Sequence, residues 1–163
     1  SEVRKKKKKN HKKNINYIHK FLYKYNIMVK VTYKGKSRDI PAQYLKGLKG
    51  KDREKQIKSI FEGTIRPKTK APEKRSSYVI KFEKRYNKKI TDEDWIHKNI
   101  ITRTGQKKIM DKAMGAYYSG GSRPNQTPSS WAYARLASVL VGGPARKIDK
   151  NIYDKYRIKK NKK

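Results

Sequence analysis

A chain of 163 residues with 46 Lys or Arg against 13 Asp or Glu has a formal net charge of +33, with 34% hydrophobic residues. The length fits one domain, and the charge points first to nucleic acid and second to an anionic membrane or an acidic protein surface. The absence of cysteine excludes disulfides and thiolate chemistry, and no apolar run reaches the roughly 18–20 residues of a membrane span.

The chain begins with a basic arm, residues 1–13, and ends with a basic tail, residues 158–163. The arm has no apolar middle of the kind found in a signal peptide, and alone in water we expect it to be disordered. Both segments are predicted to bind nucleic acid or an acidic surface through the cations of their side chains. These are Arg4, Lys5, Lys6, Lys7, Lys8, Lys9, Lys12, Lys13, Lys159, Lys160, Lys162 and Lys163.

Between these segments we expect a single domain, residues 14–157, of the α+β class: mainly helical, with a small β-hairpin and a small compact core. A helix is predicted at about 14–25, and period-two alternation predicts a strand at 27–33. A turn at 34–37 leads to a weak return strand at 38–40. Further along, a helix is expected at about 51–62, and residues 63–74 have the composition of an extended, Pro- and Lys-rich linker.

Helix caps organise the next predicted elements. Ser76 or Ser77 can cap a helix that carries Val79, Phe82 and Tyr86 on one face. Thr91, followed by three acids, predicts another helix start, because acids in a first turn interact favourably with the helix dipole. Trp95, Ile96 and Ile100 are the expected buried face of that helix. A short helix at about 105–114 follows.

From Ala113 to Arg146 the chain contains no lysine, and no acid occurs between Asp111 and Asp149. Residues 115–128 have the composition of a loop, whereas Thr127 and Pro128 predict a helix start, as cap and first helical residue. The helix is expected to run to about Val141 and to end at the glycines that follow it.

Apolar or small side chains surround this predicted helix, as is typical of a buried one, so Trp131 and Trp95 are assigned to the core. Arg135 is the exception on the helix. We expect its guanidinium to join the preceding polar loop or a neighbouring carbonyl to the helix. After the glycines, Ile148, Ile152 and Tyr156 predict one last helix.

No constellation in the sequence predicts catalysis, a metal or a cofactor. His11, His19 and His97 have no metal-ligand spacing, and the acids at 92–94 would point in different directions around a helix. The serines at 119, 122, 129 and 130 have no partnered His and Asp. The chain is therefore predicted not to be an enzyme.

The segment Gly120, Gly121, Ser122 and Arg123 leaves two alternatives open. Exposed backbone amides and a guanidinium are suited to an anion or a partner, although the P-loop pattern is absent. The other reading is a rigid turn in which the glycines supply positive φ and Arg123 binds a backbone carbonyl.

Residues 116–156, AYYSGGSRPNQTPSSWAYARLASVLVGGPARKIDKNIYDKY, contain a recognisable series of motifs. An aromatic pair precedes SGGSRPNQT, then SW, ARLASV, GG and ARKID. This series resembles the signature of an uncharacterised domain family of large double-stranded DNA viruses of algae and amoebae and of marine tailed phages. The resemblance covers about residues 38–157. It implies a viral context and no catalytic residues.

Charge and resemblance together predict a non-enzymatic structural protein of a virion, a minor capsid or internal component. Its expected partners are capsid or other virion proteins and nucleic acid, with DNA favoured over RNA, in a hetero-assembly and without a membrane span. The virion, and the host cytoplasm or viral factory during assembly, are the expected locations. The alternative is a nucleic-acid-binding protein free in the infected cell or in a ribonucleoprotein such as a ribosome, which contacts phosphates without reading sequence.

Overall fold

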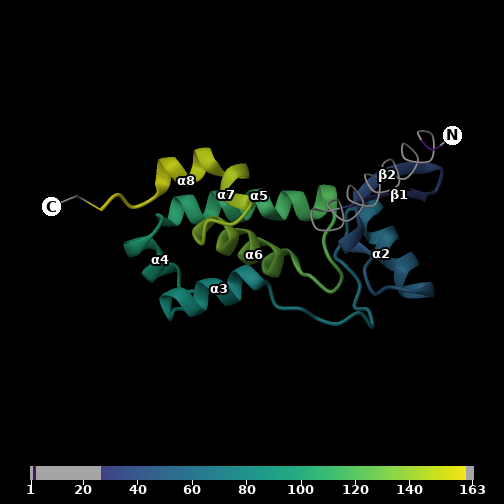
Figure 1. The fold of residues 1–163 in the computed structure, drawn as a ribbon, viewed down its shortest axis with the longest axis horizontal. Coiled ribbons are helices and arrows are strands. Elements are labelled where there is room, and N and C mark those ends of the chain that lie inside the picture. Colours follow the sequence, from purple (N-terminus) through teal and green to yellow (C-terminus); the bar gives the residue numbers. More distant parts are fainter. Residues whose placement is uncertain (1, 3–26, 161–163) are drawn as a thin grey trace.

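The computed structural model describes Glu2 and residues 27–160, and it confirms a mainly helical α+β chain with one hairpin (Figure 1). The helix expected at 14–25 and the cations at positions 4–13, 162 and 163 lie outside these residues. The elements are β1 (Met28–Tyr33), β2 (Lys36–Pro41), the 3-10 turn η1 (Ala42–Tyr44), α2 (Gly50–Glu62), α3 (Ser77–Tyr86), α4 (Glu93–Asn99), α5 (Arg103–Gly120), α6 (Pro128–Leu140), α7 (Ala145–Ile148) and α8 (Lys150–Tyr156).

β1, β2, η1 and α2 form a hairpin lobe with its own hydrophobic cluster. The strands are antiparallel with Val31 opposite Arg38, and a two-residue turn at Lys34 and Gly35 connects them. Both turn residues have positive φ, 46° and 76°, as hairpin turns that match the strand twist require. Val31 and Ile40 are buried beneath Ile57 and Ile60 of α2. The strand predicted at 27–33, its return strand and the helix at 51–62 are confirmed.

α3 to α8 form a helical lobe around a second hydrophobic cluster. α6 lies along α5 at its centre, with α3 and α4 on one side and α7 and α8 on the other (Figure 1). Leu136, Val139 and Leu140 of α6 are buried against Ile109 of α5 and Phe82 of α3. The expected buried helix is confirmed, as is its Thr127 cap, whose side chain accepts from the Ser130 amide.

Two of the predicted helix boundaries are wrong. α5 runs to Gly120, through half of the segment expected to be loop, because Ala113 and Tyr117 are fully buried and tertiary packing outweighs the helix-weakening glycine at 115. The last predicted helix is two short ones. The chain breaks at Asp149, and Ile148 is 63% exposed rather than on a buried face.

The start of α4 differs by one residue from the prediction. Asp92, not Thr91, is the cap: its Oδ1 accepts from the Trp95 amide at 3.1 Å, because its carboxylate lies one residue closer to the first turn. Ile96 is fully buried, while Trp95 and Ile100 are half-buried.

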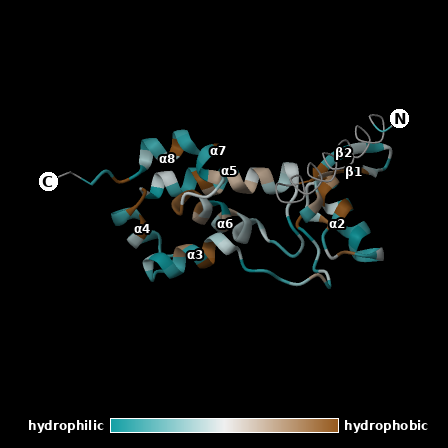
Figure 2. Cartoon of the chain, viewed as in Figure 1, coloured by the Kyte–Doolittle hydropathy of each residue, from teal (hydrophilic) through white to brown (hydrophobic). Residues whose placement is uncertain are grey.

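Figure 2 shows how hydropathy varies along the chain. The second half of α5 and the first turns of α6 are pale, whereas α2, α3 and α8 combine hydrophilic turns with hydrophobic ones. Across the part of the chain that is described, no helix has both the length and the apolar character needed to cross a bilayer.

Candidate nucleic-acid interface

Every lysine between residues 27 and 160 is exposed. Four of them form ion pairs with acids of the described residues: Lys34 with Glu62, Lys107 with Asp111, Lys112 with Asp149 and Lys150 with Asp154. The other lysines in this range have no such acid partner. The folded body therefore presents unneutralised ammonium groups on α2, α3, the linker and the end of α8.

Most arginines, in contrast, bind the protein itself. Arg38 donates to Ser119 O at 2.7 Å and to Ile60 O at 3.4 Å, at the C-terminal ends of α5 and α2. Arg66 is only 5% exposed, and its Nη2 donates to Ser59 O and Tyr117 O at the same two helix ends. A cation at a helix C-terminus is favoured by the helix dipole, so these carbonyls offset part of the cost of burying Arg66, whose Nε and Nη1 have no hydrogen-bond partner among the described residues.

Arginines also cap the C-terminus of α6. Arg146 donates to Val139 O at 2.8 Å and to Leu140 O at 3.1 Å, and its guanidinium lies 4.3 Å from the centroid of the Tyr153 ring. Because a guanidinium has several donors in one plane, it can satisfy carbonyls that a single ammonium could not.

Arg135 forms a bidentate pair with Asp149, whose carboxylate is fully buried. Nε donates to Oδ2 and Nη2 to Oδ1, both at 2.7 Å, and the Lys112 ammonium lies 3.1 Å from Oδ1. The expectation that Arg135 binds the polar loop or a carbonyl is therefore wrong, because the break between α7 and α8 brings Asp149 against α6. Burial alone would raise the pKa of Asp149, but the hydrogen bonds and charges of Arg135 and Lys112 outweigh it and lower that pKa.

The Gly120–Arg123 segment is a corner between the two lobes. Gly121 has φ 91°, its amide donates to Tyr117 O, and an added Cβ would lie 3.0 Å from the Ile60 side chain. Ser122 is fully buried, and its carbonyl accepts from the Gln56 side chain. This geometry favours the rigid turn.

Arg123 itself is exposed, and within residues 27–160 no carbonyl or carboxylate accepts from its guanidinium. It lies near Tyr44, whose pKa is raised by burial, with the charges of Arg123 and Arg66 opposing that rise. Of the four residues of the candidate anion loop, the Arg123 side chain is the one that remains available to a ligand.

Buried polar residues that the sequence analysis did not single out hold the lobes together. The Tyr117 hydroxyl accepts from the Arg66 amide at 2.7 Å and donates to Gln126 O at 2.9 Å, while the Arg66 guanidinium lies 4.6 Å from the Tyr117 ring centroid. Asn125 accepts from the Thr69 amide and donates to Ala71 O, which fixes the linker against the corner. The sequence did not predict these roles, because an arginine near prolines, such as Arg66, and an asparagine in a loop, such as Asn125, are too common to indicate a structural contact.

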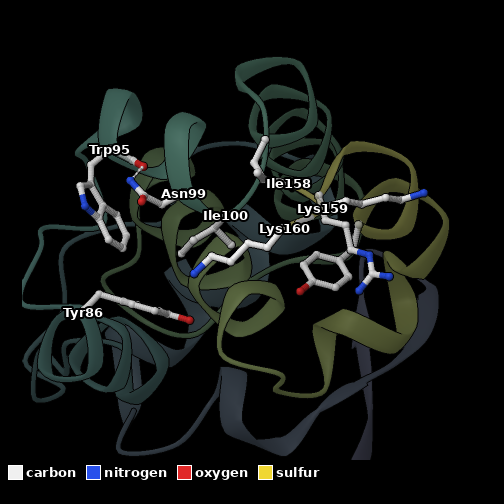
Figure 3. Close-up of a pocket in the computed structure, with 9 residues that line it drawn as sticks. Tyr86, Trp95, Asn99, Ile100, Ile158, Lys159 and Lys160 are labelled. Carbon is white, nitrogen blue, oxygen red and sulfur yellow. Dashed lines mark hydrogen bonds between the residues drawn. The ribbon is translucent and has the colours of Figure 1, made fainter. Parts of the chain in front are cut away.

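Trp95, Lys159 and Lys160, predicted for different roles, lie in one groove (Figure 3). Trp131, which was assigned to the core, belongs to neither hydrophobic cluster: it is half-buried, with its ring 5.8 Å from the Tyr44 ring and nearly perpendicular to it. The acids and the histidine of the α4 region are occupied locally: Glu93 and Asp94 pair with Arg103, and His97 Nδ1 accepts from the Arg103 amide at 3.0 Å. No three His, Asp or Glu side chains converge as metal ligands within the described part of the chain.

The family of unknown function DUF5824 matches residues 36–157, three quarters of the chain. The chain belongs to this family. No curated protein and no solved structure matches it.

The DUF5824 region begins in β2 and ends just after α8. It contains the corner, the Arg135–Asp149 pair and the aromatic side of the groove. The basic arm and Lys159 and Lys160 lie beyond the match, so the groove combines side chains of the DUF5824 region with cations that follow it.

Proposed function

We propose that this DUF5824 protein is a non-enzymatic structural component of a large double-stranded DNA virus, a minor capsid or internal virion protein that binds packaged nucleic acid and acidic capsid surfaces. The observation that carries this proposal is the division of its cations. Most arginines are hydrogen-bonded within the fold, whereas lysines are all exposed and mostly unpaired across residues 27–160.

An exposed lysine is a strongly hydrated point charge on a flexible stem, which contacts a phosphate without a fixed geometry. A surface covered with such groups binds a phosphate backbone by counterion release and does not read bases. The viral setting is supported by the motif series at residues 116–156, which resembles the viral signature.

Binding of random-sequence duplex DNA should weaken steeply with salt, with log K falling by about 0.9 per phosphate neutralised for each unit of log salt concentration. Replacing Lys51, Lys55 and Lys58, which are exposed on α2, with Gln should flatten this slope, because contacts to phosphate are lost. The same three positions changed to Arg provide the matched control and should keep the slope. A slope near zero for the unaltered chain would contradict nucleic-acid binding.

Mass spectrometry of purified particles tests the virion placement. We expect the chain among the particle proteins. If it is absent from particles but binds DNA with a steep salt dependence, the protein acts in the infected cell instead, and the structural role is wrong.

A further inference from the structure

Three aromatic side chains and three cations share one open groove on the helical lobe (Figure 3). Its volume is about 590 Å³, within the range of small-ligand pockets. The rings belong to Tyr86, Trp95 and Tyr153. The cations are Arg157, Lys159 and Lys160, and no acid lines the groove.

The aromatic side of the groove, Tyr86 and Trp95, is held in place by a buried ring. The rings of Tyr86 at the end of α3 and Trp95 in α4 are 5.4 Å apart at an interplanar angle of 50°, and both contact the ring of Phe82, which is fully buried. Tyr86 and Trp95 are themselves half-buried and line the groove, so each has ring surface left to contact a ligand. A wall fixed in this way offers stacking area at little entropic cost.

The cationic side is fixed by the backbone that follows α8. The Ile158 amide donates to Ile100 O at 2.7 Å, and an isolated antiparallel bridge joins Arg157 to Ile101. These contacts hold the chain beside the end of α4, so that Lys160 lies opposite the rings, whereas the Lys159 side chain lines the groove but extends away from them (Figure 3). In Figure 3 the Lys160 side chain extends into the space between Trp95 and Tyr86. Within the described residues, none of the three cations has a hydrogen-bonding or ion-pairing partner for its side chain.

Flat ring surface beside unpaired cations, with no acid, is the combination that proteins use for unpaired nucleic-acid strands. The rings stack on bases, and the cations contact phosphates. Duplex DNA cannot use the rings, because its bases are stacked inside the helix. Asn99 donates to Trp95 O at 2.8 Å, which leaves its Oδ1 as an acceptor at the groove for a base edge.

We propose that this groove binds single-stranded nucleic acid, with bases stacked on Trp95 and on Tyr86 and the flanking phosphates on Arg157, Lys159 and Lys160. The inference rests on the proposed nucleic-acid-binding function and adds to it a site and a ligand class. The exposed lysines would bind the phosphate backbone of a duplex at many places on the surface. The groove would bind unpaired strands selectively.

Tryptophan fluorescence of the full-length chain tests the proposal, because the protein has two tryptophans. Trp131→Phe keeps an aromatic ring against Tyr44 and leaves Trp95 as the only indole. An oligothymidylate should quench Trp95, and an abasic oligomer of equal length and charge should quench it much less. On the same background, Tyr86→Leu should reduce the preference for the oligothymidylate over the abasic oligomer on the order of tenfold, since one stacking contact is lost.

Charge reversals separate the groove from the general surface. Lys159→Glu with Lys160→Glu should weaken oligothymidylate binding more than duplex binding. The matched control, Lys51→Glu with Lys55→Glu on α2, should weaken both equally. Circular dichroism of every variant establishes that it is folded.

Two results would overturn the groove proposal while leaving the proposed function intact. One is tight, salt-dependent duplex binding with no quenching of Trp95 by oligothymidylate. The other is equal quenching by the abasic oligomer or by polyglutamate, which would show that the groove binds any anionic polymer and does not require bases. Failure to bind either duplex or single strands would instead contradict the proposed function itself.

Discussion

The buried carboxylate of Asp149 accepts two hydrogen bonds from Arg135 and lies 3.1 Å from the Lys112 ammonium. Burying a charge is costly unless it is paired and hydrogen-bonded, and here both oxygens are satisfied. The pair joins α6 to the start of α8, and Lys112 joins them to α5. In a chain with an excess of cations, this one acid determines where three helices meet.

Asp149→Asn should lower the free energy of unfolding by on the order of 3 kcal/mol, because Arg135 would keep its buried charge without a counter-ion. Urea denaturation followed by circular dichroism measures the change. The control is Asp154→Asn, at an exposed pair with Lys150, which should have little effect. Equal effects for the two variants would contradict the role of Asp149.

The lowered pKa of Asp149 gives this contribution a pH dependence. A carboxyl whose pKa is lower in the folded than in the unfolded state stabilises fully above its unfolded pKa, about 3.9, and loses that effect as the pH falls through the folded value. The stability gap between wild type and Asp149→Asn should therefore be constant near neutrality and close below about pH 4.

Single-residue roles were the hardest to predict from sequence. Arg135 was expected to bind the polar loop or a neighbouring carbonyl, because its partner Asp149 lies fourteen positions later, across a helix break that hydrophobic spacing does not reveal. Arg66 gave no signal because its partners are main-chain carbonyls at two helix ends, and any residue type supplies those.

Elements with strong local signals were predicted well. Three of these signals depend only on residues a few positions apart: the alternation in β1, the Thr127–Pro128 start of α6 and the glycines that follow α6. α5 was predicted too short because its second half is held by tertiary contacts of Tyr117, which local propensity does not include. The split between α7 and α8 was missed for a related reason.

Gly105 permits the close contact between α5 and α8. A Cβ there would lie 2.5 Å from Cβ of Tyr156 and 2.7 Å from Cγ1 of Ile101. We expect Gly105→Ala to destabilise the fold by about 1–3 kcal/mol, because the overlap outweighs the gain in helix propensity. Urea denaturation midpoints measure this change.

Gly115, in the same helix, is the matched control, since nothing lies within 4 Å of an added Cβ. Gly115→Ala should stabilise the protein by about 0.5–1 kcal/mol. If Gly105→Ala also stabilises it, the packing of α8 on α5 is looser than the structure describes.

On the scale of the whole molecule, the two hydrophobic clusters are separate, and they are joined through polar side chains and the contact of Tyr44 with Trp131. Arg38, Gln56 and Arg66 reach carbonyls of the other lobe or of its helix ends, and Asn125 holds the linker. The spacing of hydrophobic residues predicted a mainly helical fold, and the excess charge can be counted from the sequence. The sequence did not predict the groove, because Trp95 and Lys159 are brought together only by the backbone pairing of the tail with α4.

The net charge of +33 acts against these small cores through self-repulsion. A polyanion that binds the folded surface should therefore stabilise the protein beyond simple screening. With duplex DNA at about 100 times its Kd, we expect roughly 2.7 kcal/mol of stabilisation, which corresponds to an increase in Tm of about 5–10 °C for a chain of this size.

Thermal unfolding followed by circular dichroism, at constant ionic strength, measures this shift. The control is a mononucleotide at the same total phosphate concentration, which screens charge equally but cannot bridge many lysines at once. Its effect on Tm should be small. If the mononucleotide raises Tm as much as the duplex does, the stabilisation is screening alone, and the lysine surface has no preference for a continuous backbone.

A Tm that falls when duplex is added would mean that the polyanion binds the unfolded chain more tightly than the folded one. An extended chain exposes the same ammonium groups without the spacing imposed by the helices. The sign of the shift thus reports whether the arrangement of lysines on the folded body, and not the charge alone, determines binding.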